Sequence, residues 1–159
     1  MSGLTETFIK YSESVSSKNI LISSDDFFSS ISSNNYNYIS LKTEKQYNQE
    51  VSAGKEGIST ALVEADFAIA ETGSVVIEST DEALRKATCL AERLYVAVPV
   101  SRIVPSLEDI ANFLEEKTSN PASFTAFITG ASRTADIERV LTIGVHGPCE
   151  MTVYIITDR

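Results

Sequence analysis

The feature that most constrains the fold of this chain is the alternation of continuous apolar runs with capped amphipathic stretches. The run Leu94–Val100 is rich in β-branched residues and almost unbroken in its apolar character, which is typical of a central strand. Amphipathic stretches follow the pairs Ser79/Glu82 and Ser106/Asp109, whose spacing is that of a helix capping box. Helices that alternate with buried strands predict a layered α/β fold, an αβα sandwich with a mixed central sheet.

The same patterns place the individual elements. Strands are expected near Asn19–Ser23, Tyr36–Leu41, Ala65–Ala70, Ser74–Glu78, Leu94–Val98, Phe124–Thr129 and Thr152–Ile156. Helices are expected over Leu4–Val15, Thr43–Gly54, Leu84–Ala91 and Leu107–Leu114. A short link around Gly73 joins two apolar runs and predicts a hairpin, which makes the sheet mixed. Since no internal repeat and no long linker occurs, residues 1–159 are expected to form a single domain.

The charge of the chain excludes several classes of partner. With a formal net charge of −9, the chain lacks the basic face that nucleic acids require, and anionic membrane surfaces are disfavoured for the same reason. No apolar run approaches the roughly 18 residues of a membrane span. The first residues also lack the basic start and apolar core of a secretion signal. We therefore expect a cytoplasmic protein that binds neither nucleic acid nor membrane.

Cysteine and histidine are too few for a metal centre. Cys89 and Cys149 are far apart and neither belongs to a C-x-x-C pair, while His146 is the single histidine. A four-ligand metal site or an iron–sulfur cluster held within this chain is not expected, and neither is a cofactor. Both thiols are expected to be reduced.

The segment ITGASRTADIERVLTIGVHGP, Ile128–Pro148, carries the strongest candidate for a binding site. An apolar strand stops at Gly130, and the residues Ala135–Leu141 then return to helical spacing. A strand that runs into a helix start leaves unpaired backbone N–H groups, which predicts an anion site. Arg133 would add a guanidinium that can bind a carboxylate or phosphate through two hydrogen bonds.

A structural explanation of the same segment stays open. Ser132 or Thr134 would then cap the helix, and Arg133 would form an ion pair with Asp136 or Glu138.

Three glycine-punctuated turns, Glu71–Ser74, Gly130–Asp136 and Gly144–Pro148, each lie at or near the end of an apolar run. Ligands of open α/β sheets bind where such strand ends meet, so the three turns are expected to line one cleft. There, Glu71 could act as a base or nucleophile and His146 as an acid or orienting group. The alternatives are that Glu71 only completes a turn and that His146 bonds to backbone. The candidate ligand-binding residues are Thr72, Gly73, Ser74, Gly130, Ser132, Arg133, Thr134 and Asp136.

Three segments carry a family resemblance: GIS…ADFAIAETGSVVIES, RLYVAVPVSRIVPSLEDI and ITGASRTADIERVLTIGVHGP. They resemble the LUD domain, the lactate-utilization family, and within it the lactate utilization protein C type, over residues 57–159. The resemblance implies a fold similar to that of sugar-phosphate isomerases and CoA transferases. It also implies a place beside iron–sulfur proteins in the oxidation of L-lactate to pyruvate. The chain departs from the family pattern at Thr88–Glu92, where the family usually has a proline-containing stretch, and at Ala131, where proline is common.

Two functions from different classes follow from the resemblance. The first is an accessory component of an L-lactate-oxidising system that binds a small anion, docks to iron–sulfur partner proteins, or does both. The alternative is a free-standing enzyme of the sugar-phosphate isomerase or CoA-transferase type that uses Glu71 as base or nucleophile. A purely structural or regulatory subunit is a third, weaker alternative. The identity of the ligand, catalytic activity and assembly into a homo-oligomer stay open.

Overall fold

The computed structural model describes residues 20–22, 38–40, 60–131, 133–135, 141–143 and 147–157. Its strands are β1 (Ile20–Ile22), β2 (Tyr38–Ser40), β3 (Thr60–Glu64), β4 (Phe67–Ile69), β5 (Ser74–Ser79), β6 (Arg93–Pro99), β7 (Ile103–Val104), β8 (Phe124–Ile128), β9 (Arg133–Ala135), β10 (Leu141–Ile143) and β11 (Glu150–Ile156). Its helices are α4 (Glu82–Leu90) and α5 (Ala111–Thr118), with short 3-10 turns η1 (Val100–Arg102) and η2 (Glu108–Ile110).

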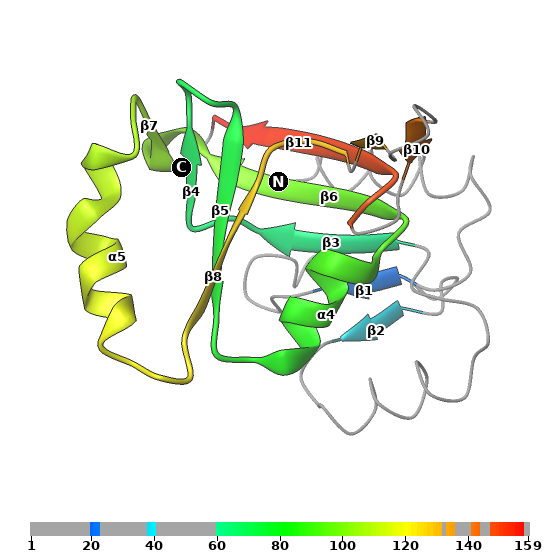
Figure 1. Ribbon diagram of the computed structural model, residues 1–159, viewed down its shortest axis with the longest axis horizontal. Coiled ribbons are helices and arrows are strands. Elements are labelled where there is room, and N and C mark those ends of the chain that lie inside the picture. Colours follow the sequence, from blue (N-terminus) through cyan, green and yellow to red (C-terminus); the bar gives the residue numbers. More distant parts are fainter. Residues whose placement is uncertain are drawn as a thin grey trace.

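The first sheet is parallel throughout. Its five strands follow the order β11-β6-β3-β1-β2, and β6 lies between β3 and β11 (Figure 1). From Leu94 to Val98, the residues of β6 are at most 2% exposed, because both faces of the strand are covered. The prediction of a central strand from the continuous apolar run is therefore confirmed.

The second sheet is mixed. Its order is β7-β4-β5-β8, with β4 parallel to β7 and the other neighbours antiparallel. The predicted hairpin is the pair β4 and β5, and Gly73 in its turn has φ +66°. The α/β class is confirmed, and this second sheet is mixed as expected, but the central sheet that contains β6 was also expected to be mixed and is parallel instead. The hairpin, however, belongs to this second sheet and not to the sheet that contains β6.

The chain passes from the first sheet to the second over two residues. The N–H of Ala65 donates to Ala97 O at 2.9 Å in the first sheet, and the N–H of Asp66 donates to Val76 O at 2.9 Å in the second. The expected strand Ala65–Ala70 is thus only β4, and β3 is a separate strand in front of it. The path from β6 through η1 to β7 makes the same crossing, since β7 runs parallel to β4.

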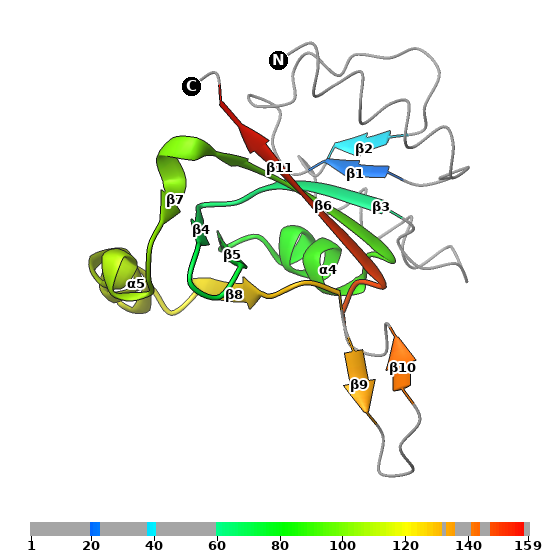
Figure 2. The ribbon, with the colours of Figure 1, turned by 90° about the horizontal axis from the view of Figure 1, so that it is seen from above.

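Two apolar clusters hold the layers together. Between the two sheets, α4 contributes Ala87 and Ala91 to a core with the apolar residues of β3, β5 and β6. On the far face of the second sheet, α5 packs against β4, where the rings of Phe67 and Phe113 meet edge to face at 5.0 Å. Figure 2 shows α4 beside the first sheet and α5 beyond the second. Both helices were predicted and are confirmed.

The predicted caps differ in detail. Before η2 the Asp109 carboxylate accepts a hydrogen bond from Ser106 N at 2.8 Å, which is one half of a capping box. The other half is absent, because the Ser106 hydroxyl donates to the same carboxylate at 2.9 Å and the N-cap of η2 is Leu107. At α4, the N–H of Arg85 donates to Asp81 O, so Asp81 and not Ser79 is the N-cap. The Ser79 hydroxyl accepts from Asp81 N at 2.8 Å and stabilises the turn before the helix.

The helix expected over Ala135–Leu141 is wrong. Ala135 belongs to β9 and Leu141 to β10, and these residues pair with each other in an antiparallel hairpin. A helix of two turns has little stability of its own, and the β-branched residues Thr134, Thr142 and Ile143 favour strands. The helices expected over Leu4–Val15 and Thr43–Gly54 lie outside the described residues.

Candidate functional site

The turn that joins β4 to β5 is fixed by backbone hydrogen bonds. Gly73 N donates to Ile69 O at 2.9 Å within the turn, and Glu71 N donates to Pro105 O at 3.0 Å outside it. A positive φ at Gly73 costs an L-residue energy, which explains why glycine stands here. The side chains of Glu71 and Thr72 are exposed. The turn therefore presents a carboxylate and a hydroxyl to solvent on a rigid backbone.

A chain of three hydroxyl groups connects this turn to the end of β8. Ser74 Oγ lies 2.7 Å from Thr72 Oγ1 and 2.7 Å from Thr129 Oγ1. The register of β5 and β8 explains the contact, because Val75 pairs with Ile128 and so brings Ser74 opposite Thr129. Ser74 is only 5% exposed, whereas Thr72 and Thr129 are exposed. Two of the three predicted turns thus meet at one end of the second sheet.

The third turn approaches the same place. The chain leaves the two sheets at Gly130 (φ +89°) and returns at Gly147 (φ +133°), and both glycines line one cavity. Between them, β9 and β10 project away from the two sheets (Figure 2). Arg133 is the first residue of β9, and its side chain is exposed. Its guanidinium is therefore carried on a projecting hairpin and not at a helix start.

The structure brings together five of the ten predicted site residues, which are Glu71, Thr72, Gly73, Ser74 and Gly130. Thr134 lies in β9, where its backbone pairs with Thr142. The candidates Ser132, Asp136 and His146 lie outside the described residues. Since Arg133–Ala135 form a strand, no helix N-terminus supplies backbone N–H groups to the predicted anion site. The donors that remain for an anion are hydroxyl groups and the guanidinium of Arg133.

One group of polar residues was not foreseen. Asp66 Oδ2 accepts a hydrogen bond from Glu78 N at 2.7 Å, and Glu78 Oε1 accepts one from Ser123 Oγ at 2.7 Å. Lys117 Nζ lies 4.0 Å from Glu78 Oε2. Burial raises the pKa of Asp66 above its usual value of 3.8, against the lowering effect of the hydrogen bond from Glu78 N.

This group ties the start of β4 to β5 and to the end of α5. The signal in the sequence was a single acidic residue, Asp66, inside an apolar run. A half-buried carboxylate of this kind requires hydrogen-bond partners, but the sequence alone does not identify them.

Among the described residues, no group of three His, Cys, Asp or Glu side chains is placed to hold a metal ion. None of the helices in this part of the chain is both long and apolar enough to cross a membrane. Cys89 and Cys149 are free and exposed.

The LUD domain family matches residues 9–156 of the chain. "Lactate utilization protein C" of Anoxybacillus flavithermus is 34% identical over 75% of this chain and 56% of its own length. The protein of the same name from Geobacillus thermodenitrificans is 34% identical over 68% of this chain and 49% of its own length. The chain spans about half the length of the curated relatives it matches. A solved structure of a DUF162 family protein from Deinococcus radiodurans aligns over 97% of this chain and 96% of its own, with a TM-score of 0.48 and 11% identity.

Proposed function

The chain belongs to the LUD domain family, and on this basis we propose that it is an accessory component of an L-lactate utilization system that binds a small organic anion. The process, lactate utilization, is proposed from the relatives named "Lactate utilization protein C". The anion is proposed to bind where the turn Glu71–Ser74 meets the end of β8. Iron–sulfur proteins of the same system are the proposed partners.

The observation that carries the anion site is the contact between Ser74 and Thr129. It joins two segments that are far apart in the sequence, and both belong to the motifs that resemble the family. Hydroxyl groups that already point toward one another form a polar surface on a rigid sheet end, which is the usual setting of a binding site. Two of the three hydroxyl protons are used within this chain, so one of the exposed hydroxyls, Thr72 or Thr129, can donate to a carboxylate.

Arg133 is proposed to supply the positive charge. It follows Gly130 by three positions, and its exposed guanidinium can bind a carboxylate through two parallel hydrogen bonds. Lysine cannot reproduce this geometry. Since the chain has a net charge of −9, an anion needs such a local cation in order to bind.

The enzyme alternative, with Glu71 as base or nucleophile, has less support. Glu71 lies exposed in its turn, whereas a carboxylate that acts as base or nucleophile usually lies in a cleft that excludes water. Mass spectrometry after incubation with acyl-CoA tests it directly, because a covalent acyl adduct on Glu71 would establish the alternative.

The proposed site is tested with L-lactate and pyruvate as ligands in calorimetric titrations. Arg133→Ala and Arg133→Lys are both expected to weaken binding at least about tenfold, which corresponds to about 1.4 kcal/mol. Neither should change the free energy of unfolding by more than about 0.5 kcal/mol, since the side chain is exposed. Loss of stability in step with binding would show that Arg133 is structural.

The proposed partners are tested separately. Tagged protein is purified from cells grown on L-lactate, with cells grown on another carbon source as control. Recovery of iron–sulfur proteins only from the lactate-grown cells supports the accessory role. Their absence from both preparations contradicts it.

A further inference from the structure

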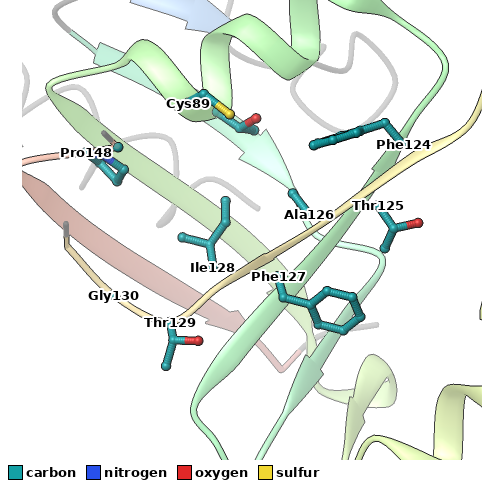
Figure 3. Close-up of a pocket in the computed structure, with 11 residues that line it drawn as sticks. Cys89, Phe124, Thr125, Ala126, Phe127, Ile128, Thr129, Gly130 and Pro148 are labelled. Carbon is teal, nitrogen blue, oxygen red and sulfur yellow. The ribbon is translucent and has the colours of Figure 1, made fainter. Parts of the chain in front are cut away.

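A cavity of about 550 Å³ opens along β8, on the side of the strand that faces α4. Figure 3 shows Phe124, Ala126 and Ile128 pointing into it from β8, with Cys89 and Pro148 on the opposing walls. The side chains that alternate with them, Thr125, Phe127 and Thr129, point to the other side of the strand (Figure 3). These three residues border the cavity, but their side chains lie on the same side of β8 as the hydroxyl groups of the proposed anion site.

We propose that this cavity binds an uncharged aromatic molecule of one or two rings. The size is appropriate, because sites for small organic ligands usually have volumes of about 300–1,000 Å³. A three-carbon hydroxy acid would leave most of this volume empty. The proposal does not depend on the anion site.

The lining determines the charge of the ligand. The residues that line the cavity are Thr88, Cys89, Phe124, Thr125, Ala126, Phe127, Ile128, Thr129, Gly130, Gly147 and Pro148, and none of them is charged. A charged group buried here would lose its hydration without gaining a partner. The last turn of α4 also ends at this wall, and the carbonyl groups of a helix C-terminus disfavour anions. The ligand of this cavity is therefore neutral.

The walls favour an aromatic ring. Phe124 remains 44% exposed and presents its ring to the cavity, opposite Pro148. The guanidinium of Arg85 lies 5.9 Å from the centre of that ring, which holds Phe124 in this orientation. Aromatic rings bind well against such surfaces, and the sulfur of Cys89 makes a further favourable contact with a ring.

The hydroxyl of Thr88, at the α4 wall, is already engaged. Thr88 Oγ1 donates to Arg85 O at 2.9 Å and to Leu84 O at 3.1 Å. Its hydroxyl therefore does not require a polar ligand atom, and the ligand needs no hydrogen-bonding group on that side.

The test uses 6-propionyl-2-(dimethylamino)naphthalene, a neutral two-ring dye whose emission rises and shifts to shorter wavelength in apolar surroundings. Wild type is compared with Ala126→Phe, which fills the cavity, and with Thr125→Phe, which introduces the same side chain on the other side of β8. We expect wild type and Thr125→Phe to bind the dye, and Ala126→Phe to bind it at least about tenfold more weakly. No binding to wild type, or equal binding to the two variants, overturns the proposal.

A second measurement on wild type does not depend on the folding of a variant. Both cysteines are alkylated with N-ethylmaleimide, and mass spectrometry follows each site with and without saturating dye. Cys89 lines the cavity and Cys149 does not. The dye should slow alkylation of Cys89 at least about fivefold and leave Cys149 unchanged, because bound ligand covers only the former. An unchanged rate at Cys89 overturns the proposal.

Discussion

The hydroxyl oxygens of Ser74 and Thr129 lie 2.7 Å apart, although 55 positions separate the two residues in the sequence. Ser74 is buried and shares a second hydrogen bond with Thr72, so Ser74→Ala removes both bonds at once. We expect a loss of about 1–2 kcal/mol in the free energy of unfolding, measured in urea, because the two exposed threonine hydroxyls can turn to water.

Two matched variants make this prediction specific. Thr129→Val removes only one of the two bonds and should cost about half as much as Ser74→Ala. Thr125 lies in β8, four positions before Thr129 and outside this chain of hydroxyls, so Thr125→Val serves as control. If all three variants lose the same stability, the hydroxyl chain makes no specific contribution.

Gly73 provides a test of backbone conformation alone. A Cβ atom added there would meet no heavy atom within 4 Å, so the cost of Gly73→Ala comes only from its φ of +66°. We expect Gly73→Ala to destabilise the protein by about 1–2 kcal/mol, and Gly73→Asn by less, because asparagine tolerates this conformation. Thermal unfolding of the two variants measures the difference, and equal losses would contradict this explanation.

Local signals predicted most of the elements in the described part of the chain. The continuous apolar runs gave β5, β6, β8 and β11, and the capped amphipathic stretches gave α4 and α5. The sheet to which each strand belongs could not be predicted in this way. Between β3 and β4 the chain passes from the first sheet to the second at Ala65–Asp66. The residues before and after this point are similarly apolar, so the sequence does not show that they belong to different sheets.

The hairpin of β9 and β10 shows where periodicity fails. The spacing of apolar residues over Ala135–Leu141 fits a helix. Seven residues are too few, however, for the period of this pattern to distinguish a helix from a strand. In the structure the two strands extend beyond these seven residues, and Arg133 in β9 pairs with Ile143 in β10. The sequence of one strand does not reveal its pairing with the other.

The proximity of the turn Glu71–Ser74 to Gly130 was predicted, but the structure achieves it in a different way from the one expected. The turn Glu71–Ser74 was expected near Gly130 because strand ends gather ligand-binding loops, and antiparallel pairing of β5 with β8 brings them together. The carboxylates Asp66 and Glu78 were missed because their partnership depends on residues from three different elements.

The guanidinium of Arg102 binds the chain where it passes from the first sheet to the second, at Glu64 and Ala65. Arg102 Nη1 donates to Glu64 Oε1 at 2.8 Å and to Ala65 O at 3.1 Å. The Arg102 side chain is 41% exposed, so water and salt weaken the pair, and Arg102→Ala should cost only about 1–2 kcal/mol. Arg102→Lys should recover part of this loss.

An exposed pair on α4 is the control for Arg102. Lys86 and Glu82 lie one helical turn apart, and Lys86→Ala should change the free energy of unfolding only slightly, because water screens an exposed ion pair. Both losses are measured in urea at low and high salt. A loss for Arg102→Ala no larger than that for Lys86→Ala would mean that the guanidinium does not hold the crossing.

The raised pKa of Asp66 predicts how stability depends on pH. Burial disfavours its carboxylate, so the folded state holds the Asp66 proton more tightly than the unfolded state does. The stability that this proton contributes is fully present below the usual pKa of 3.8 and is lost as the pH rises through the raised folded pKa. Asp66→Asn keeps an oxygen that can accept from Glu78 N but cannot ionise.

The free energy of unfolding of Asp66→Asn should therefore increase relative to wild type as the pH rises from about 3.5 toward 7, and the difference should become constant above the folded pKa. Asp66→Ala is the control, because it removes the acceptor of the hydrogen bond from Glu78 N and should lose about 1–3 kcal/mol near pH 7. Urea unfolding across this pH range measures both, and carbon-13 NMR of the Asp66 carboxyl measures its pKa directly. A stability difference between Asp66→Asn and wild type that does not change with pH, together with a carboxyl that titrates at or below 3.8, would show that burial does not control this group.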